Sequence, residues 1–134
     1  MKNGKKCIII LSSVLLAGLL TAILFFVILP ERSYEDIRQM SIQNVNLDQL
    51  EDGVYQGEFA YGQYTYHAEV TVKNHRIEEI KLSHGNKSKQ AKAAEGVIDT
   101  ILTEQKVDVD VVSGATTTSK AILKAVENAL SQNK

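Results

Sequence analysis

The chain has 134 residues, a formal net charge of −1 and a single cysteine, Cys7. This length allows one compact domain besides any membrane segment, and a nearly neutral chain offers no basic field for nucleic acid. A lone cysteine excludes an intrachain disulfide framework, and no two histidines have the spacing of metal ligands, so we expect no metal site.

Residues 8–29 form an uncharged, apolar run of about 22 residues, and roughly 20 suffice for a helix to cross a bilayer. Three lysines stand among the first six residues, whereas Pro30 and Glu31 follow the run. Lysines on one flank place that flank in the cytoplasm. We therefore expect a cytoplasmic segment over 1–7, a single-pass anchor over 8–29, and an extracytosolic C-terminal part.

A cleaved signal peptide is the alternative for this run. Such peptides have an apolar core of roughly 7–15 residues that ends in a small-x-small site. Here the run is longer and its end, residues 25–29, is bulky, which favours a retained anchor. Cys7 precedes the run, unlike the lipid acceptor of a lipoprotein, so we interpret it as an interfacial residue, with palmitoylation as the alternative.

Residues 30–51 are polar with scattered apolar positions and are typical of a stalk or linker, which leaves 52–134 as the domain. From residue 64 to 72, tyrosine, alanine and valine alternate with polar residues, as in a strand with one buried face. A shorter strand around Gly57 precedes it, and another over 76–82 follows an Asn74-His75 turn. These three strands predict an antiparallel meander.

Apolar residues recur at helical spacing over 88–102, with Gly96 as a weak point, and again over 119–130. Between them, residues 106–112 are β-branched and predict a short strand. The whole pattern predicts an α+β fold, with a small antiparallel sheet and two packed helices preceded by one N-terminal transmembrane helix.

The turn between this last strand and last helix is rich in hydroxyl groups. Gly114 can adopt a positive φ, Ala115 leaves room for a ligand, and a helix N-terminus that follows favours an anion. The pattern is compatible with a phosphate cradle. A Ser/Thr cluster before a helix is more commonly a plain N-cap, which Thr118 or Ser119 can provide alone.

Residues 110–119 read Asp-Val-Val-Ser-Gly-Ala-Thr-Thr-Thr-Ser and precede an Ala/Ile/Val-rich helix. This string resembles the FMN-binding domain of one Rnf complex subunit, of the C subunit of sodium-translocating NADH:quinone reductase, and of small extracytosolic electron-transfer flavoproteins. "DGVYQGEF" and "AEVTVKNHRIEEIKLSH" are similar to that domain's opening and central hairpin. The resemblance covers about residues 52–131.

The resemblance implies FMN attached covalently to a threonine by a phosphoester bond. A separate flavin transferase would move FMN from FAD onto the hydroxyl, using magnesium. The implied acceptor is Thr116, with Thr118 as the alternative. The other implied cofactor-binding residues are Asp110, Ser113, Gly114, Ala115 and Thr117.

The function implied is an electron carrier between a membrane donor and an external acceptor, held in membrane lipid, rather than a stand-alone enzyme with catalytic residues. A non-redox or reversible flavin-binding module in adhesion or sensing is one alternative. An accessory subunit of an ion-translocating redox complex is another. Residues 83–96 replace the family's Pro/Gly-rich loop, and we expect His84 there to be a solvated loop residue, or otherwise to lie near the flavin ring.

Overall fold

The structure is a computed structural model that describes residues 14, 16–23 and 34–132. The chain divides into two compact units, Met1–Glu35 and Asp36–Lys134. In the first unit, the described residues are helical. Within the described ranges, no helix is both long enough and apolar enough to cross a membrane. The expected anchor over 8–29 and its cytoplasmic flank lie largely outside those ranges.

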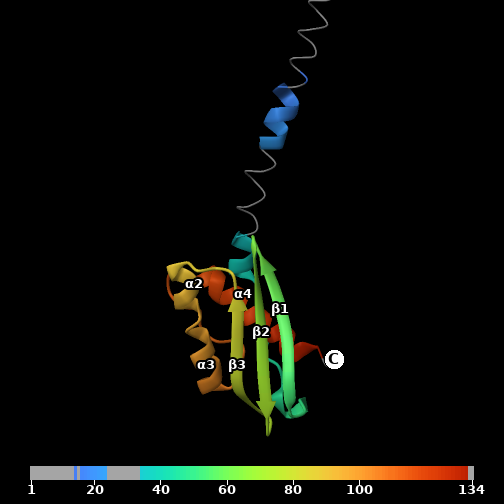
Figure 1. Ribbon diagram of the computed structural model, residues 1–134, viewed down its shortest axis with the longest axis vertical. Helices are drawn as coiled ribbons and strands as arrows, with labels where there is room; N and C mark the ends of the chain where they lie inside the picture. Colours follow the sequence, from blue (N-terminus) through green and yellow to red (C-terminus); the bar gives the residue numbers. More distant parts are fainter. Residues whose placement is uncertain (1–13, 15, 24–33, 133–134) are drawn as a thin grey trace, which may run out of the picture. The chain divides into compact units, whose positions relative to one another are not determined.

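The second unit is an α+β domain built on a three-stranded antiparallel sheet in the order β1-β2-β3 (Figure 1). The strands are β1 (Gly53–Tyr61), β2 (Tyr64–Lys73) and β3 (Arg76–His84), which confirms the predicted meander. Asn74 and His75 both adopt positive φ angles, 49° and 58°, in the tight turn between β2 and β3. This geometry suits a two-residue hairpin loop, because it matches the twist of the flanking strands.

Three helices pack with this sheet: α2 (Lys89–Ala94), α3 (Val97–Glu104) and α4 (Thr116–Ser131). The single helix predicted over 88–102 is therefore divided, and the break falls at Glu95 and Gly96. Glycine weakens a helix interior because it lacks a side chain and keeps more backbone freedom. The Gly96 N–H bonds back to the Ala93 carbonyl at 3.1 Å, which closes α2 in a tighter turn.

Helix α4 lies against the inner face of β1 and β2, where the core is centred. The close approach depends on Gly57 in β1. A Cβ added there would lie 2.2 Å from the Ala129 nitrogen of α4 and 2.5 Å from the Ala125 oxygen. Residues on the same face of β2, Tyr66 to Val72 at every second position, are fully buried beneath the helix.

The strand predicted over 106–112 is wrong. These residues are extended, and Val107 and Val109 point into the core with exposed fractions of 1% and 7%. The segment nevertheless joins no sheet, because the N–H groups of Val107 and Asp108 bond to the side chain of Asn44. The alternating β-branched residues thus predicted which side chains are buried, but they wrongly predicted that the segment pairs with a strand.

Residues 36–52, which precede the sheet, belong to the same unit. Residues 34–39 are helical, residues 40–46 are extended, and a short 3-10 helix, η1 (Leu47–Gln49), leads to β1. Ile42 and Leu50 are each 5% exposed and belong to the core. The compact unit therefore begins at Asp36 and includes residues whose polarity suggested a stalk.

Candidate functional site

The hydroxyl-rich turn is a tight β-turn with an open side. The Ala115 N–H donates to the Val112 carbonyl at 3.0 Å, and Gly114 has the positive φ, 77°, that the sequence predicted. This φ suits the third position of a type II turn, which glycine occupies without strain. A Cβ added at Gly114 would meet no atom within 4 Å, so the space before the turn is open.

Helix α4 begins at Thr116, earlier than the predicted start at Ser119. Its N-cap residue is Ala115, and no side chain caps the helix. The N-cap interpretation of Thr118 and Ser119 is therefore wrong, because both lie inside the helix. The first helical bond runs from the Ser119 N–H to the Ala115 carbonyl at 2.9 Å, so the N–H groups before Ser119 lack an α-helical acceptor and carry the positive end of the helix dipole.

The hydroxyl groups of this first turn differ in accessibility. Thr116 and Thr117 are half-buried, whereas Thr118 is 9% exposed and Ser119 is fully buried. The Ser119 Oγ accepts a hydrogen bond from the Val112 N–H at 3.2 Å, which ties the segment before the turn to the helix after it. Sequence reasoning missed this role, although Ser119 closes the hydroxyl-rich string.

Asp110 stands at the exposed approach to the turn, and its carboxylate makes no hydrogen bond within the described chain. Nearby, Glu104 lies 2.8 Å from the Lys106 ammonium group. The hydrogen bond and charge of Glu104 raise the pKa of Lys106, and Asp108 and Asp110 contribute less. Asp110 is thus an exposed residue in the segment before the turn.

A pocket of about 440 Å³ opens where β3 ends and α2 begins. The His84 side chain in its wall is only 7% exposed, so the expectation of a solvated loop histidine is wrong. Its ring packs against Tyr66 with centroids 5.1 Å apart, and its Nε2 lies 3.3 Å from the Glu95 carboxylate. Its Nδ1 is buried and has no partner in the described chain. The pocket is lined by Leu82, Ser83, His84, Asn86, Lys87, Ser88, Lys92 and Glu95.

The pocket and the turn belong to the same end of the domain. Helix α2, which forms one wall of the pocket, contacts α4. A Cβ at Gly96, one residue after the pocket-lining Glu95, would lie 3.8 Å from the Val112 side chain at the start of the turn. Figure 1 shows the end of β3, α2 and the beginning of α4 gathered at this end of the sheet.

Comparison with known proteins identifies the domain. The family model described as "FMN-binding domain" matches residues 62–131, about half of the chain. An uncharacterized protein of Treponema pallidum (strain Nichols) is 40% identical over 86 residues, which are 63% of this chain and 24% of that relative. The chain thus spans about a quarter of the length of this relative.

The residues present fit an FMN group. The turn offers a half-buried threonine at Thr116 and open space at Gly114, and the uncapped start of α4 suits a phosphate. In the wall of the pocket beside it, His84 has a buried Nδ1 without a partner in the described chain, and such a group is costly to leave unpaired. The chain therefore belongs to the family of FMN-binding domains, and FMN is its cofactor.

Proposed function

We propose that this chain is a membrane-anchored, extracytosolic electron carrier whose FMN is bound covalently to Thr116 through a phosphoester. One observation carries the proposal. Thr116 is a half-buried residue at the uncapped N-terminus of α4, directly after an open turn. The charge-free run over 8–29 and the lysines before it support the anchor and its orientation.

Accessibility favours Thr116 over Thr118 as the acceptor. A transferase must bring the phosphorus of its substrate to the attacking oxygen, so the hydroxyl has to be reachable from solvent. Thr118 is 9% exposed and faces the interior of the domain, whereas Thr116 is half-buried at the first helical position. Thr117 is also half-buried. Thr116 is preferred to Thr117 because it occupies the acceptor position in the string that resembles FMN-binding domains.

The attachment reaction is a phosphoryl transfer that balances without oxidation. The Thr116 Oγ1 attacks the flavin-side phosphorus of FAD, the new O–P bond forms, and the pyrophosphate bond breaks to release AMP. The hydroxyl proton passes to a base of the flavin transferase, and magnesium held by the transferase offsets the charge of the pyrophosphate. The first-turn N–H groups of α4 then favour the single negative charge that the phosphodiester keeps.

Once bound, the isoalloxazine ring supplies the electron-transfer chemistry, and the protein supplies its surroundings. We place the ring beside the pocket at the end of β3. There His84, whose Nδ1 is buried without a partner in the described chain, lines the pocket, and Lys87 and Lys92 offer positive charge. Positive groups near the ring favour the electron-rich form of the cofactor, because they offset its added charge.

Denaturing gel electrophoresis with in-gel flavin fluorescence tests the attachment. The full chain is co-expressed with a flavin transferase, alongside Thr116→Ala and the matched control Thr117→Ala, which removes the neighbouring, equally exposed hydroxyl. We expect fluorescence in the wild type and in Thr117→Ala and none in Thr116→Ala. A dark wild type rejects covalent attachment, whereas a fluorescent Thr116→Ala that darkens on Thr118→Ala reassigns the acceptor.

The orientation and the carrier role need separate experiments. Protease added to intact protoplasts should digest the C-terminal domain, and full protection of the domain would overturn the outward orientation. For the carrier role, the flavinylated chain in membranes should be reduced by a membrane donor and reoxidised by an added, membrane-impermeant acceptor. A flavin that stays oxidised with every membrane donor supplied favours a non-redox binding module.

A further inference from the structure

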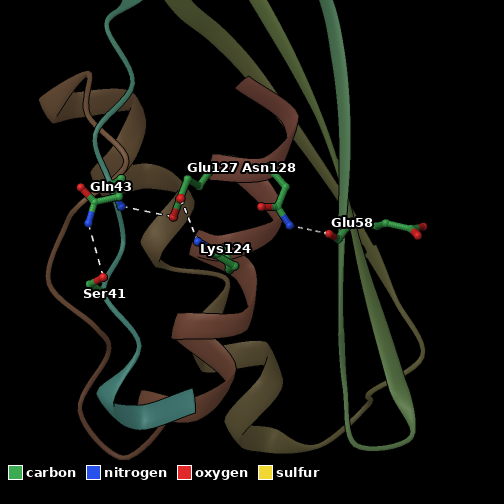
Figure 2. A network of polar contacts seen from close by, with 6 residues as sticks. All are labelled: Ser41, Gln43, Glu58, Lys124, Glu127 and Asn128. Carbon is green, nitrogen blue, oxygen red and sulfur yellow. Dashed lines mark hydrogen bonds and ion pairs between the residues drawn. The ribbon is translucent and has the colours of Figure 1, made fainter. Parts of the chain in front are cut away.

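Residues 40–46, which we call the strap, run extended along α4 on the side away from β1 (Figure 2). The strap lies outside residues 62–131, which match the FMN-binding domain. Ile42 anchors it in the core with an exposed fraction of 5%. It makes polar contacts with Glu127 of α4 and with Val107 and Asp108. The last two precede the turn at residues 112–115, which we call the attachment turn.

The first contact is with Glu127 of α4, whose side chain is only 9% exposed. Its carboxylate accepts the Gln43 N–H at 3.2 Å and the Lys124 ammonium group at 2.8 Å (Figure 2). A carboxylate this buried must keep its partners, because leaving it unpaired costs a large part of its desolvation energy. The contact therefore fixes where Gln43, and so the next residue, Asn44, lies along α4.

The second contact is made by Asn44. Its side-chain oxygen accepts two hydrogen bonds, from the Val107 N–H at 3.1 Å and from the Asp108 N–H at 2.8 Å. Residues 106–112 have no neighbouring strand, so this one oxygen supplies bonds that a sheet would otherwise provide. An extended segment without a ladder depends on such contacts for a single conformation.

The segment held by Asn44 ends in the attachment turn. Its far end is fixed by Ser119, whose Oγ accepts the Val112 N–H, and Thr116 lies between these two residues at the start of α4. The same helix carries Glu127. The strap therefore contacts α4 directly through Gln43, and it contacts the extended segment before the turn through Asn44. That segment is in turn bonded to the start of α4 through Ser119.

We propose that Asn44 is a positioning residue for flavin attachment, and this role rests on the proposed function. By holding Val107 and Asp108, Asn44 keeps the segment before the turn in one conformation, so that the Thr116 hydroxyl meets the transferase in a reactive geometry. Asn44 touches neither the acceptor nor the cofactor. Its loss should slow attachment while the core, which it does not enter, stays folded.

The test measures flavin transfer to the full chain in mild detergent, with purified flavin transferase, FAD and magnesium. Asn44→Ala should lower kcat/KM by about tenfold, the effect of losing hydrogen bonds worth roughly 1.4 kcal/mol together. Asn44→Asp keeps an acceptor oxygen and should restore at least half of the wild-type rate. Asn46→Ala is the matched control, because among the described residues the Asn46 side chain bonds to the nearby Asp48 N–H, at 3.1 Å, and not to the segment before the turn.

Amide hydrogen exchange gives a readout that does not depend on flavin. Exchange at Val107 and Asp108 should be about tenfold faster in Asn44→Ala and unchanged in Asn46→Ala. Asn44→Ser, whose shorter side chain can reach at most one of the two amides, should fall between and serves if the alanine variant does not fold.

The outcomes separate this role from the proposed function. A wild type that accepts no flavin rejects both. If the wild type is flavinylated, three results reject only the role of Asn44. In the first, Asn44→Ala accepts flavin as fast as the wild type, and in the second, Asn46→Ala accepts it as slowly as Asn44→Ala. In the third result, Asn44→Asp restores none of the lost transfer rate.

Discussion

Glu127 and Asn128 are adjacent on α4, and their side chains hold opposite sides of the domain (Figure 2). Glu127 accepts the Gln43 N–H of the strap, whereas Asn128 donates to the Glu58 carbonyl of β1 at 2.8 Å. Successive residues on an α-helix point about 100° apart, so two neighbours can face different elements. One helix therefore fastens the strap and the sheet, and it also begins at the proposed acceptor, Thr116.

Glu127→Ala should destabilise the domain by about 1–3 kcal/mol, because it leaves a backbone N–H and a half-buried ammonium group without their acceptor. Urea unfolding of the full chain in detergent, followed by tyrosine fluorescence, measures this effect, since all five tyrosines lie beyond residue 29. Glu104→Ala removes an exposed ion pair with Lys106 and should leave the stability nearly unchanged. Equal losses in the two variants would contradict a special role for Glu127.

Gly57→Ala should be among the most damaging single methyl additions to the domain. Its Cβ would lie 2.2 Å from the Ala129 nitrogen, so α4 must shift away from β1, at a cost of about 3 kcal/mol. Gly85→Ala is the matched control, because its Cβ would meet only the Tyr64 ring, at 3.8 Å. The same urea titration compares the two, and a Gly57→Ala variant as stable as Gly85→Ala would show that α4 does not need this close approach.

Gly114→Ala should act through backbone strain alone. The added Cβ meets no atom within 4 Å, but an alanine at a φ of 77° costs about 1–2 kcal/mol. Asparagine tolerates this region better, so Gly114→Asn should lose less stability and keep more flavin attachment than Gly114→Ala. Thermal unfolding and in-gel fluorescence check both variants, and the reverse order would mean that bulk at the turn matters more than strain.

His84→Phe should change the spectrum of the attached flavin. Phenylalanine keeps an aromatic ring against Tyr66 but removes both ring nitrogens from the pocket. If the flavin ring lies beside this pocket, its absorption maximum and fluorescence yield shift, while a His67→Phe variant on the exposed sheet face leaves them unchanged. Unaltered spectra in both variants would place the ring elsewhere.

Much of the fold could be predicted from local patterns. The three strands follow from alternating polar and apolar residues, and the positive φ at Gly114 follows from a glycine in a strand-to-helix turn. Each of these features depends on residues close together in the chain, where side-chain period and backbone sterics act directly. Membership of the family of FMN-binding domains could also be recognised locally, from the continuous string at residues 110–119 and two segments upstream of it.

The sequence-based predictions that were wrong share a different physical origin. Residues 106–112 have the composition of a strand, but their backbone partner is a side chain 63 residues earlier, Asn44. The sequence predicted His84 in a polar loop, yet it is the last residue of β3, and its buried side chain contacts Tyr66 and Glu95. Thr118 and Ser119 have the chemistry of N-caps, but α4 starts before them, and packing places both in the interior.

The sequence by itself determined the sheet, the family and its FMN, because local periodicity and a short motif encode them. Only the tertiary structure decided that Thr118 is buried while Thr116 and Thr117 are half-buried, that Ile42 and Leu50 before the sheet belong to the core, and that Asn44 holds the segment before the turn. Accessibility and long-range hydrogen bonds depend on which segments meet in space, and no local pattern in the chain specifies that meeting.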